Sequence, residues 1–382
     1  MSRSGQVDLS VIIVNYNVAP LVLKAVASLE RQRFTAQDGR AGRLEILVID
    51  NASPPEDVAR LEGLPSGVVL VRNERNVGFA AANNQGIERA SGRYLGFLNP
   101  DAKVLDGALD ALLQHLYRHP EVGAVGPKIW ADDECTLLLP PADPPTLSFL
   151  LSGLVGGAIQ TLAERHSVAW HRRAITYWRS RAPFPVMILS GACILTSRDV
   201  VNRVGGFDPG YFLYYEDADW CWRVRRAGCR LAVVPDAEIV HYYNQSAKLD
   251  PREAQGHAQR SQARFVQAHY GLPGILIYRA ARAASSRVAR WRWPTAPHQV
   301  IDLGRWTEPP RLSITAGVPL HELVVEIGYD CLLLPSAAAF VSDTEFQLSL
   351  PVWERMQPGR YYARMIDPET VRPLALWSWE KG

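Results

Sequence analysis

The feature that most constrains the fold is an alternation of short apolar runs with segments of helical periodicity in the first hundred residues. The apolar runs occupy residues 9–14, 44–49, 68–72 and 94–98, and each is followed by polar residues. Residues 20–31 and 79–89 have the spacing of helices. Central strands of a parallel sheet are buried on both faces, which gives such uninterrupted apolar runs. The pattern therefore predicts an α/β protein in which helices flank a βαβ sheet.

Asn99, Pro100 and Asp101 directly follow the fourth of these predicted strands. Pro100 ends the strand because it cannot donate to a sheet ladder. Ligands of open α/β sheets bind outside the carboxyl ends of the strands. Oxygen-bearing side chains at that edge suit a hard divalent cation such as Mg²⁺ or Mn²⁺, which also binds phosphates. The same tripeptide is common in ordinary turns, so it indicates a metal site only together with the other strand ends.

Asp50 ends the second predicted strand and supplies a carboxylate, which accepts strong, directed hydrogen bonds from a nucleobase or a ribose. Asp50 to Ser53 also fits an Asx-turn or a helix N-cap, and both interpretations stay open. No Gly-x-Gly-x-x-Gly motif and no Walker loop follows the first strand. A Rossmann dehydrogenase and a P-loop enzyme are therefore disfavoured.

Composition limits the class of protein further. A chain of 382 residues favours two domains, and the net charge of +2 gives no case for binding nucleic acid. The polar residues 1–8 predict no signal peptide, and no apolar run is long enough to span a membrane. The five cysteines are widely spaced and form no Cys-x-x-Cys pair. This pattern predicts reduced, packed thiols in a cytoplasmic protein.

A second polar centre gathers three carboxylates, Glu216, Asp217 and Asp219, within four positions. Such crowding costs free energy unless a cation or a proton relieves it, and it can raise a pKa toward that of a useful base. Arg223 and Arg225 are candidate partners. On a helix, Asp219 and Arg223 would be neighbours at i,i+4, which is also the spacing of an ordinary salt bridge.

Four motifs in this order resemble family 2 glycosyltransferases of the GT-A fold. They lie at residues 10–17, 48–53, 76–86 and 98–101, and the resemblance extends over about residues 8 to 270. The branch that it resembles most is that of bacterial rhamnosyltransferase-like enzymes, which build cell-surface glycans. The metal motif of the family is Asp-x-Asp, whereas Asn99 occupies its first position here. An amide is a weaker ligand than a carboxylate, so Asp101 is the better candidate for direct coordination.

The resemblance also implies roles for individual residues. Asp217 would be the catalytic base, and Glu216 and Trp220 would bind the acceptor, while Asp219 remains the alternative base. Asp101 and His241 would hold the metal, although a histidine after a short apolar run is more often structural. The residues implied in donor binding are Asn15, Asn17, Asp50, Asn76, Gly78, Asn84 and Asn99.

The implied activity is that of a metal-dependent, inverting glycosyltransferase (a hexosyltransferase) in polysaccharide or cell-wall biosynthesis. The expected donor is a nucleotide-sugar, with dTDP-rhamnose suggested by the resemblance. The expected acceptor is a glycan or a lipid-diphosphate-linked saccharide. Two other classes stay open: a non-catalytic glycan-binding or scaffold protein, and a nucleotidyltransferase. The latter would need a basic, glycine-rich loop near the N-terminus, which residues 15–17 do not offer.

The expected domains are a GT-A glycosyltransferase domain at residues 1–272, a basic amphipathic helix or linker at 273–297, and a small β-sandwich-like domain at 298–382. Within the first domain, the apolar residues 147–162 precede a basic, aromatic run. That segment suits either a membrane surface or lipid diphosphate, or an acceptor loop packed on its own domain. The expected location is cytoplasmic, with peripheral association at the inner face of the membrane.

Overall fold

The computed structural model describes residues 6–156, 160–242, 251–289, 299–314 and 322–382. The chain forms two compact units, which are described one at a time. Unit 1 contains residues 1–128, 142–145 and 181–271, and unit 2 contains residues 129–141, 146–180 and 272–382. None of the helices in the described residues is both long enough and apolar enough to cross a membrane.

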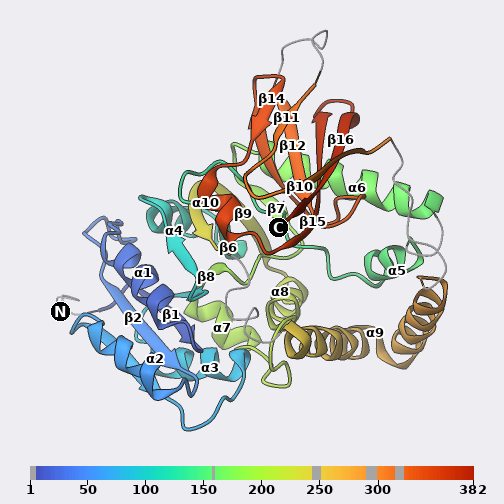
Figure 1. Ribbon diagram of the computed structural model, residues 1–382. Coiled ribbons are helices and arrows are strands. Elements are labelled where there is room, and N and C mark those ends of the chain that lie inside the picture. Colours follow the sequence, from blue (N-terminus) through green and yellow to red (C-terminus); the bar gives the residue numbers. More distant parts are fainter. Residues whose placement is uncertain (1–5, 157–159, 243–250, 290–298, 315–321) are drawn as a thin grey trace. The chain divides into compact units, whose positions relative to one another are not determined.

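Unit 1 is built on a mixed sheet, in which the described strands run in the order β3-β2-β1-β4-β8-β6-β9-β5, with β7 paired to β9 (Figure 1). The strands are β1 (Leu9–Asn15), β2 (Leu44–Asp50), β3 (Val68–Arg72), β4 (Tyr94–Leu98), β5 (Ala102–Val104), β6 (Val122–Trp130), β7 (Phe184–Val186), β8 (Cys193–Ser197) and β9 (Arg230–His241). The last two residues of β6 belong to unit 2.

The first four apolar runs form one parallel half of this sheet. In this half, β1 lies between β2 and β4, and β3 pairs with the other edge of β2. All of these pairs are parallel, and every residue of β1 is buried. Asn15 pairs with Asp50, so the ends of β1 and β2 lie side by side. From β4 onward the sheet turns antiparallel, with Leu98 opposite Cys193 of β8. The predicted α/β class is confirmed.

The helices follow the predicted periodicity. They are α1 (Ala19–Glu30), α2 (Pro55–Arg60), α3 (Phe79–Arg89), α4 (Ala108–Arg118), α7 (Arg198–Val204), α8 (Glu216–Arg226) and the first part of α9 (Pro251–Ala289), with a short 3₁₀ turn, η1, at Leu61–Gly63. The buried face of α4 carries four leucines at helical spacing, Leu109, Leu112, Leu113 and Leu116.

Unit 2 contains a five-stranded sheet in the order β10-β16-β15-β12-β13 and a two-stranded sheet, β11-β14, within the described part of the chain. The strands are β10 (Ile301–Trp306), β11 (Arg311–Ser313), β12 (Leu323–Gly328), β13 (Ser336–Val341), β14 (Glu345–Gln347), β15 (Gly359–Asp367) and β16 (Arg372–Lys381). Its helices are α5 (Leu147–Gly156), α6 (Gln160–Arg179), α10 (Leu350–Arg355) and the second part of α9.

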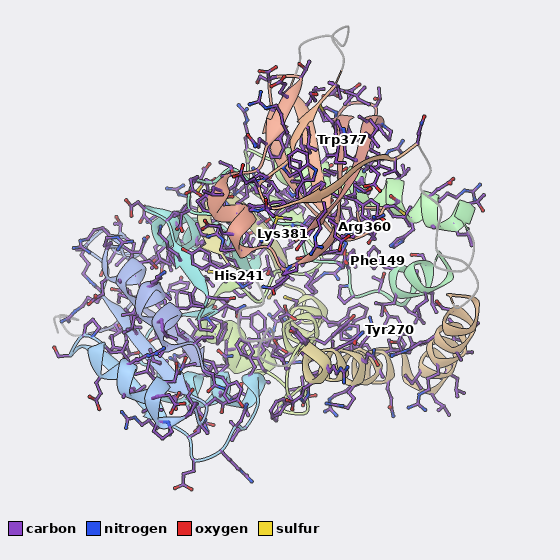
Figure 2. The ribbon with its side chains drawn as sticks, in the orientation of Figure 1. Phe149, His241, Tyr270, Arg360, Trp377 and Lys381 are labelled. Carbon is purple, nitrogen blue, oxygen red and sulfur yellow. The ribbon has the colours of Figure 1, made fainter. Side chains whose placement is uncertain are left out.

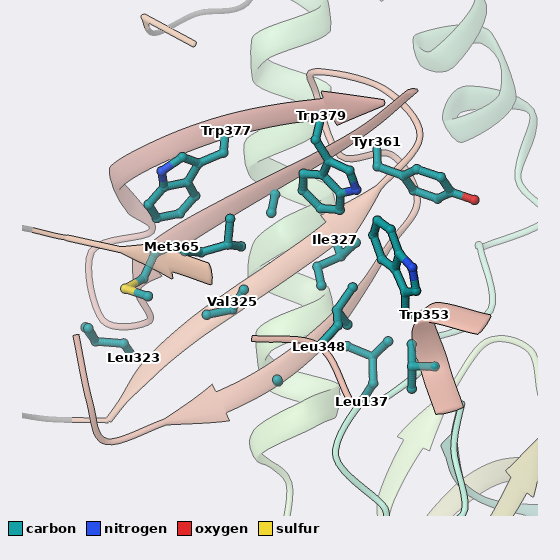
Figure 3. Packing of buried hydrophobic residues seen from close by; sticks show 14 residues of the cluster. Leu137, Leu323, Val325, Ile327, Leu348, Trp353, Tyr361, Met365, Trp377 and Trp379 are labelled. Carbon is teal, nitrogen blue, oxygen red and sulfur yellow. The ribbon is translucent and has the colours of Figure 1, made fainter. Parts of the chain in front are cut away.

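One face of the five-stranded sheet carries the apolar core of unit 2 (Figure 3). Trp353 of α10 packs there with Tyr361, Met365, Trp377 and Trp379 of β15 and β16. On β12, Val325 belongs to this face, and the next residue, Glu326, points to the opposite face because side chains alternate along a strand. A separate C-terminal β-rich region was predicted, and the structure contains one.

The opposite face of the sheet is covered by α6. His171 of this helix is fully buried, and its Nε2 lies 3.2 Å from Oε1 of Glu326, while Arg364 Nε donates to Glu326 Oε2 over 2.8 Å. The predicted boundaries placed residues 146–180 in the catalytic domain, whereas the structure groups them with the C-terminal sheet. The reason is this buried polar contact, which joins residues more than a hundred positions apart.

The predicted linker helix is the second part of α9. This helix runs from Pro251 to Ala289, and Gly271 interrupts it with φ 65° and ψ −164°. That backbone conformation is accessible to glycine at little cost. The second part of the helix therefore starts at Leu272, and residues 290–297 of the predicted linker lie outside the described residues.

Candidate active site

Glu216 and Asp217 form the first turn of α8 in unit 1. The two residues before them, Tyr214 and Tyr215, both have a φ of 66°. Two consecutive left-handed residues that are not glycine cost free energy, and such strain persists where the surroundings enforce it. Here α9 enforces it: Ser261 Oγ donates to the Leu213 carbonyl over 2.8 Å, and Gln262 Nε2 donates to the Tyr215 hydroxyl over 2.5 Å.

Asp217 is half-buried and is held by two backbone donors. The Gly191 N–H donates to Oδ2 over 2.9 Å, and the Ala218 N–H donates to Oδ1 over 2.7 Å. A Cβ on residue 191 would lie 2.9 Å from Oδ2, so glycine permits this approach. Burial raises the pKa of the Asp217 carboxyl, although the backbone hydrogen bonds act in the opposite direction. A fixed carboxylate of raised basicity can accept a proton.

Glu216 is 5% exposed, and burial raises the pKa of its carboxyl well above the usual range. The negative charge of the neighbouring Asp217 adds to this rise. Glu216 Oε2 has no hydrogen-bond partner among the residues that the structure describes. Two adjacent buried carboxyl groups resist ionising together, so the pair favours holding one proton.

This geometry predicts a pH-dependent stability for the Glu216→Gln variant. Because the pKa of Glu216 is raised in the folded state, the unfolded chain releases this proton first, above about pH 4.3. Wild-type stability then falls with rising pH until the folded carboxyl also ionises. Relative to wild type, the free energy of unfolding of Glu216→Gln should therefore increase by up to about 1.4 kcal/mol per pH unit in this window.

Urea unfolding at a series of pH values measures this difference. The matched control is Glu62→Gln, which removes an exposed glutamate of the same unit. If both variants change with pH in the same way, burial does not perturb Glu216.

Asp219, the alternative base, is paired with the guanidinium of Arg223 and the imidazole of His269. Arg223 Nε and His269 Nε2 both lie 2.8 Å from its carboxylate oxygens. Burial alone would raise the pKa of Asp219, but the hydrogen bonds from His269 and Arg223 lower it below its usual value. A carboxylate so stabilised in its charged form is a weak proton acceptor. The predicted i,i+4 pair with Arg223 is confirmed.

Trp220, which was predicted to bind the acceptor, has no exposed surface. It packs against Phe97 and Phe207, and its indole N–H donates to the Gly205 carbonyl over 3.1 Å. Direct contact with an acceptor is therefore not supported. On α8, Trp220 faces the core, three residues beyond the half-buried Asp217.

The two predicted metal ligands, Asp101 and His241, come together with Asn99, a predicted donor-binding residue, at the ends of β4 and β9. His241 Nε2 lies 3.0 Å from Asp101 Oδ1 and 3.3 Å from Asn99 Nδ2. Strand pairing causes this arrangement, because Ala102 of β5 is directly opposite His241 of β9. Figure 2 labels His241 on the side-chain view.

The donor set of this cluster fits a divalent cation with open coordination positions. It offers carboxylate oxygen from Asp101, imidazole nitrogen from His241 and amide oxygen from Asn99. Within the described residues no group of three or more His, Cys, Asp or Glu side chains gathers as a complete metal site. Oxygens of a diphosphate and water would therefore have to complete the coordination. Ser246 and Lys248 follow His241 in the sequence as further candidates for contact with phosphate oxygens, and both lie outside the described residues.

Among the predicted donor-binding residues, Asn15 and Asp50 lie at adjacent strand ends and are buried. Asn15 Nδ2 lies 2.8 Å from Asp50 Oδ1, 3.0 Å from Ser53 Oγ and 2.9 Å from Asp57 Oδ2. Its amide thus binds groups of the protein from both β2 and α2. Sequence reasoning missed Ser53 and Asp57, although an acidic residue in the first turn of a helix is a recognisable signal.

Asn17 differs from Asn15 in having an unsatisfied group. Its backbone is left-handed, with φ 60°, and its N–H donates to Ser53 Oγ over 3.0 Å. The side-chain oxygen Oδ1 is buried without a hydrogen-bond partner in the described structure. A buried acceptor without a donor is costly, which makes Asn17 Oδ1 a candidate for contact with a ligand.

Asn76 and Gly78 shape the start of α3. Asn76 Oδ1 accepts hydrogen bonds from Asn51 Nδ2 over 2.7 Å and from the Gly78 N–H over 2.9 Å. Gly78 has φ 88°, and a Cβ there would lie 2.9 Å from Phe212. The Phe79 N–H donates to the Phe212 carbonyl over 2.7 Å. This turn therefore joins α3 to the loop that leads into Glu216.

Asn84 binds the backbone of Phe207 with both of its polar groups. Its Nδ2 donates to the Phe207 carbonyl over 2.7 Å, and its Oδ1 accepts from the Phe207 N–H over 2.8 Å. The side chain is thereby committed to the loop after α7. The structure thus gives Asn84 a positioning contact in place of the predicted free donor-binding group.

Comparison with known proteins decides the family. Residues 10–205, which include the ends of β1, β2 and β4, match the family described as Glycosyl transferase family 2. The chain belongs to glycosyl transferase family 2. The resemblance seen in the sequence motifs is thereby confirmed, and glycosyltransferase activity is the activity of this family.

Three relatives illustrate the similarity. The chain is 30% identical over 261 residues to an N-acetylglucosaminyl-diphospho-decaprenol L-rhamnosyltransferase of Mycobacterium tuberculosis, covering 64% of this chain and 78% of the relative. It is 28% identical to the O-antigen biosynthesis protein RfbC of Myxococcus xanthus, covering 54% and 15%. It is 21% identical to the low-salt glycan biosynthesis hexosyltransferase Agl10 of Haloferax volcanii, covering 61% and 67%.

Two solved structures are more distantly similar. The mannosyltransferase PcManGT from Pyrobaculum calidifontis, in complex with GDP-Man and Mn²⁺, has a TM-score of 0.47 and 19% identity over 74% of each chain. GalNAc-T7 with UDP, GalNAc and Mn²⁺ has a TM-score of 0.44 and 16% identity, covering 74% of this chain and 56% of that one.

Proposed function

We propose that this family 2 glycosyltransferase transfers rhamnose from dTDP-rhamnose, with inversion, to a lipid-diphosphate-linked saccharide in the synthesis of a cell-surface glycan. The observation that carries the proposal is Asp217, a half-buried carboxylate of raised pKa, fixed by two backbone N–H groups. The sugar and the lipid-linked acceptor are supported by the mycobacterial relative, which is named as a rhamnosyltransferase acting on a decaprenol-linked diphosphate.

The proposed reaction is a single displacement. Asp217 removes the proton from the acceptor hydroxyl as that oxygen attacks the anomeric carbon of the sugar. The new glycosidic C–O bond forms as the bond to the diphosphate breaks, and the nucleoside diphosphate leaves with the bonding electrons. Attack on the face opposite the leaving group inverts the configuration. Glu216, which keeps its proton when Asp217 is ionised, offers a donor to an acceptor oxygen.

The leaving diphosphate lies, in this proposal, at the ends of β4 and β9. Asp101, His241 and Asn99 would hold a divalent cation there, Mg²⁺ or Mn²⁺, which supplies positive charge against the charge of the departing diphosphate. The nucleoside lies at the ends of β1 and β2, where Asn17 Oδ1 contacts it and Asp50 accepts its hydrogen bonds. Asn15, Asn76, Gly78 and Asn84 maintain the shape of this edge through the protein contacts described above.

The test is a panel of nucleotide sugars incubated with the purified chain, with and without Mg²⁺ or Mn²⁺, while release of nucleoside diphosphate is followed. We expect metal-dependent release from dTDP-rhamnose and slower or no release from the other donors. Release from a different sugar nucleotide would overturn the assignment to rhamnose and leave the family activity intact. If no sugar nucleotide binds at all, the chain is instead a glycan-binding or scaffold protein.

A further inference from the structure

The second part of α9 exposes an apolar face to solvent. The exposed side chains from Leu272 to Ala284 are all apolar apart from Arg279, and they are Leu272, Pro273, Leu276, Ile277, Ala280, Ala283 and Ala284. Leu272 is 69%, Leu276 56% and Ile277 52% exposed. We call these seven residues the α9 apolar face. Exposed apolar residues are common singly, but a contiguous row on one helix indicates a surface that something covers.

The opposite side of the same helix is already packed. Ile275 and Tyr278 are buried, and Arg282 Nη1 donates to the Tyr278 hydroxyl over 3.4 Å. With 3.6 residues per turn, these three side chains lie on one side, and Leu276, Ala280 and Ala283 lie on another. One apolar side of the helix is thus packed, while a second apolar side stays exposed. Among the residues that the structure describes, nothing buries the α9 apolar face.

The charged residues on this part of the helix are all positive. Arg279 is exposed at the edge of the face, and Arg282 is half-buried beside it. In the sequence, no Asp or Glu occurs between Glu253 and Asp302, whereas this interval holds seven arginines. A protein partner that covered an apolar row would need matching acidic groups at the rim, and so would a second copy of this chain. An anionic bilayer offers apolar acyl chains and negative headgroups together over any area.

We propose that the α9 apolar face docks this chain on an anionic lipid bilayer. The helix lies in the plane of the interface, with Leu272, Leu276 and Ile277 inserted among the acyl chains and Arg279 at the level of the phosphates. The proposal depends neither on the donor sugar nor on the carboxylates Glu216 and Asp217. Its one connection to the proposed function is that docking would bring the enzyme to the bilayer surface, where a lipid-linked acceptor would be.

The test is co-sedimentation of the full chain with vesicles of phosphatidylglycerol and phosphatidylcholine, and with vesicles of phosphatidylcholine alone. We expect binding to the anionic vesicles, lost at least about tenfold in the double variant Leu276→Gln/Ile277→Gln, because two inserted side chains become polar. Arg279→Gln should weaken binding about fivefold on anionic vesicles and much less on neutral ones. Neither substitution touches a buried side chain, so the fold should be retained.

The matched control is Leu350→Gln, which removes an equally exposed leucine, 55% accessible, from α10. This variant should bind vesicles like wild type. Equal binding by wild type and the double variant would overturn the proposal, as would the absence of binding to anionic vesicles. A dimer in light scattering that the double variant separates, without vesicle binding, would assign the face to a second copy instead. Donor hydrolysis measured without lipid reports separately on the proposed function.

Discussion

The Asp217→Asn variant is expected to lose turnover by about a thousandfold while it binds the donor with unchanged affinity. A positioned general base contributes about 10²–10⁴-fold to the rate, and the amide has the shape of the carboxylate without its basicity. The fixed backbone contacts from Gly191 and Ala218 make the upper half of this range reasonable, because they hold the base in one position. Transfer kinetics give the turnover, and calorimetric titration with the nucleotide gives the affinity.

Asp219→Asn is the matched control, because it makes the same chemical change two residues away. It breaks the contacts with Arg223 and His269, so its melting temperature should fall while each folded molecule keeps most of its activity. If Asp219→Asn instead abolishes turnover and Asp217→Asn does not, the two carboxylates have been assigned in the wrong order.

Asp101→Ala is expected to lose about a thousandfold or more in metal-dependent turnover. A bound divalent cation contributes several kcal/mol to stabilising the developing charge, and the Asp101 carboxylate is in contact with His241. The loss should appear with Mg²⁺ and with Mn²⁺, and raising the metal concentration should restore only part of it. Titration of the activity with metal, at saturating donor, measures both effects.

Asn99→Asp is the complementary change, since it places a second carboxylate in the cluster. Hard cations prefer charged oxygen ligands, so this variant should reach half-maximal activity at a lower metal concentration than wild type. An Asp101→Ala enzyme that keeps its metal response would show that the cation, where present, is held elsewhere. Unchanged metal requirement in Asn99→Asp would remove Asn99 from the ligand set.

The strand ends could be predicted from sequence because they follow from local properties of the chain. Apolar runs of five to seven residues define β1, β2 and β4, and the polar residue that follows each run must lie at the edge of the sheet. The pairing of Asp101 with His241 needed the family resemblance, since 140 positions separate the two side chains. Once β5 and β9 pair, that contact is a consequence of register.

Sequence alone gives the wrong role for a side chain that contacts residues far away along the chain. Asn84 looks available for a ligand until it meets the Phe207 backbone, 123 positions away. Trp220 lies close to Glu216 and Asp217 in sequence, but the helical turn rotates it into the core with Phe97. Nothing in the sequence indicates the positive φ of Tyr214 and Tyr215 either, because tyrosine rarely adopts this conformation.

The burial of His171 against Glu326 limits where this chain can be truncated or fused to another. In the sequence, helix α6 lies between β6 and β7. Strand β12, which carries Glu326, follows about 150 residues later. When residues 1–271 have been synthesised, α6 is complete, but the sheet against which His171 is buried has not yet been made. Deleting the C-terminal region would expose the buried side of α6. Residues 146–180 and the C-terminal sheet therefore have to be retained or removed together.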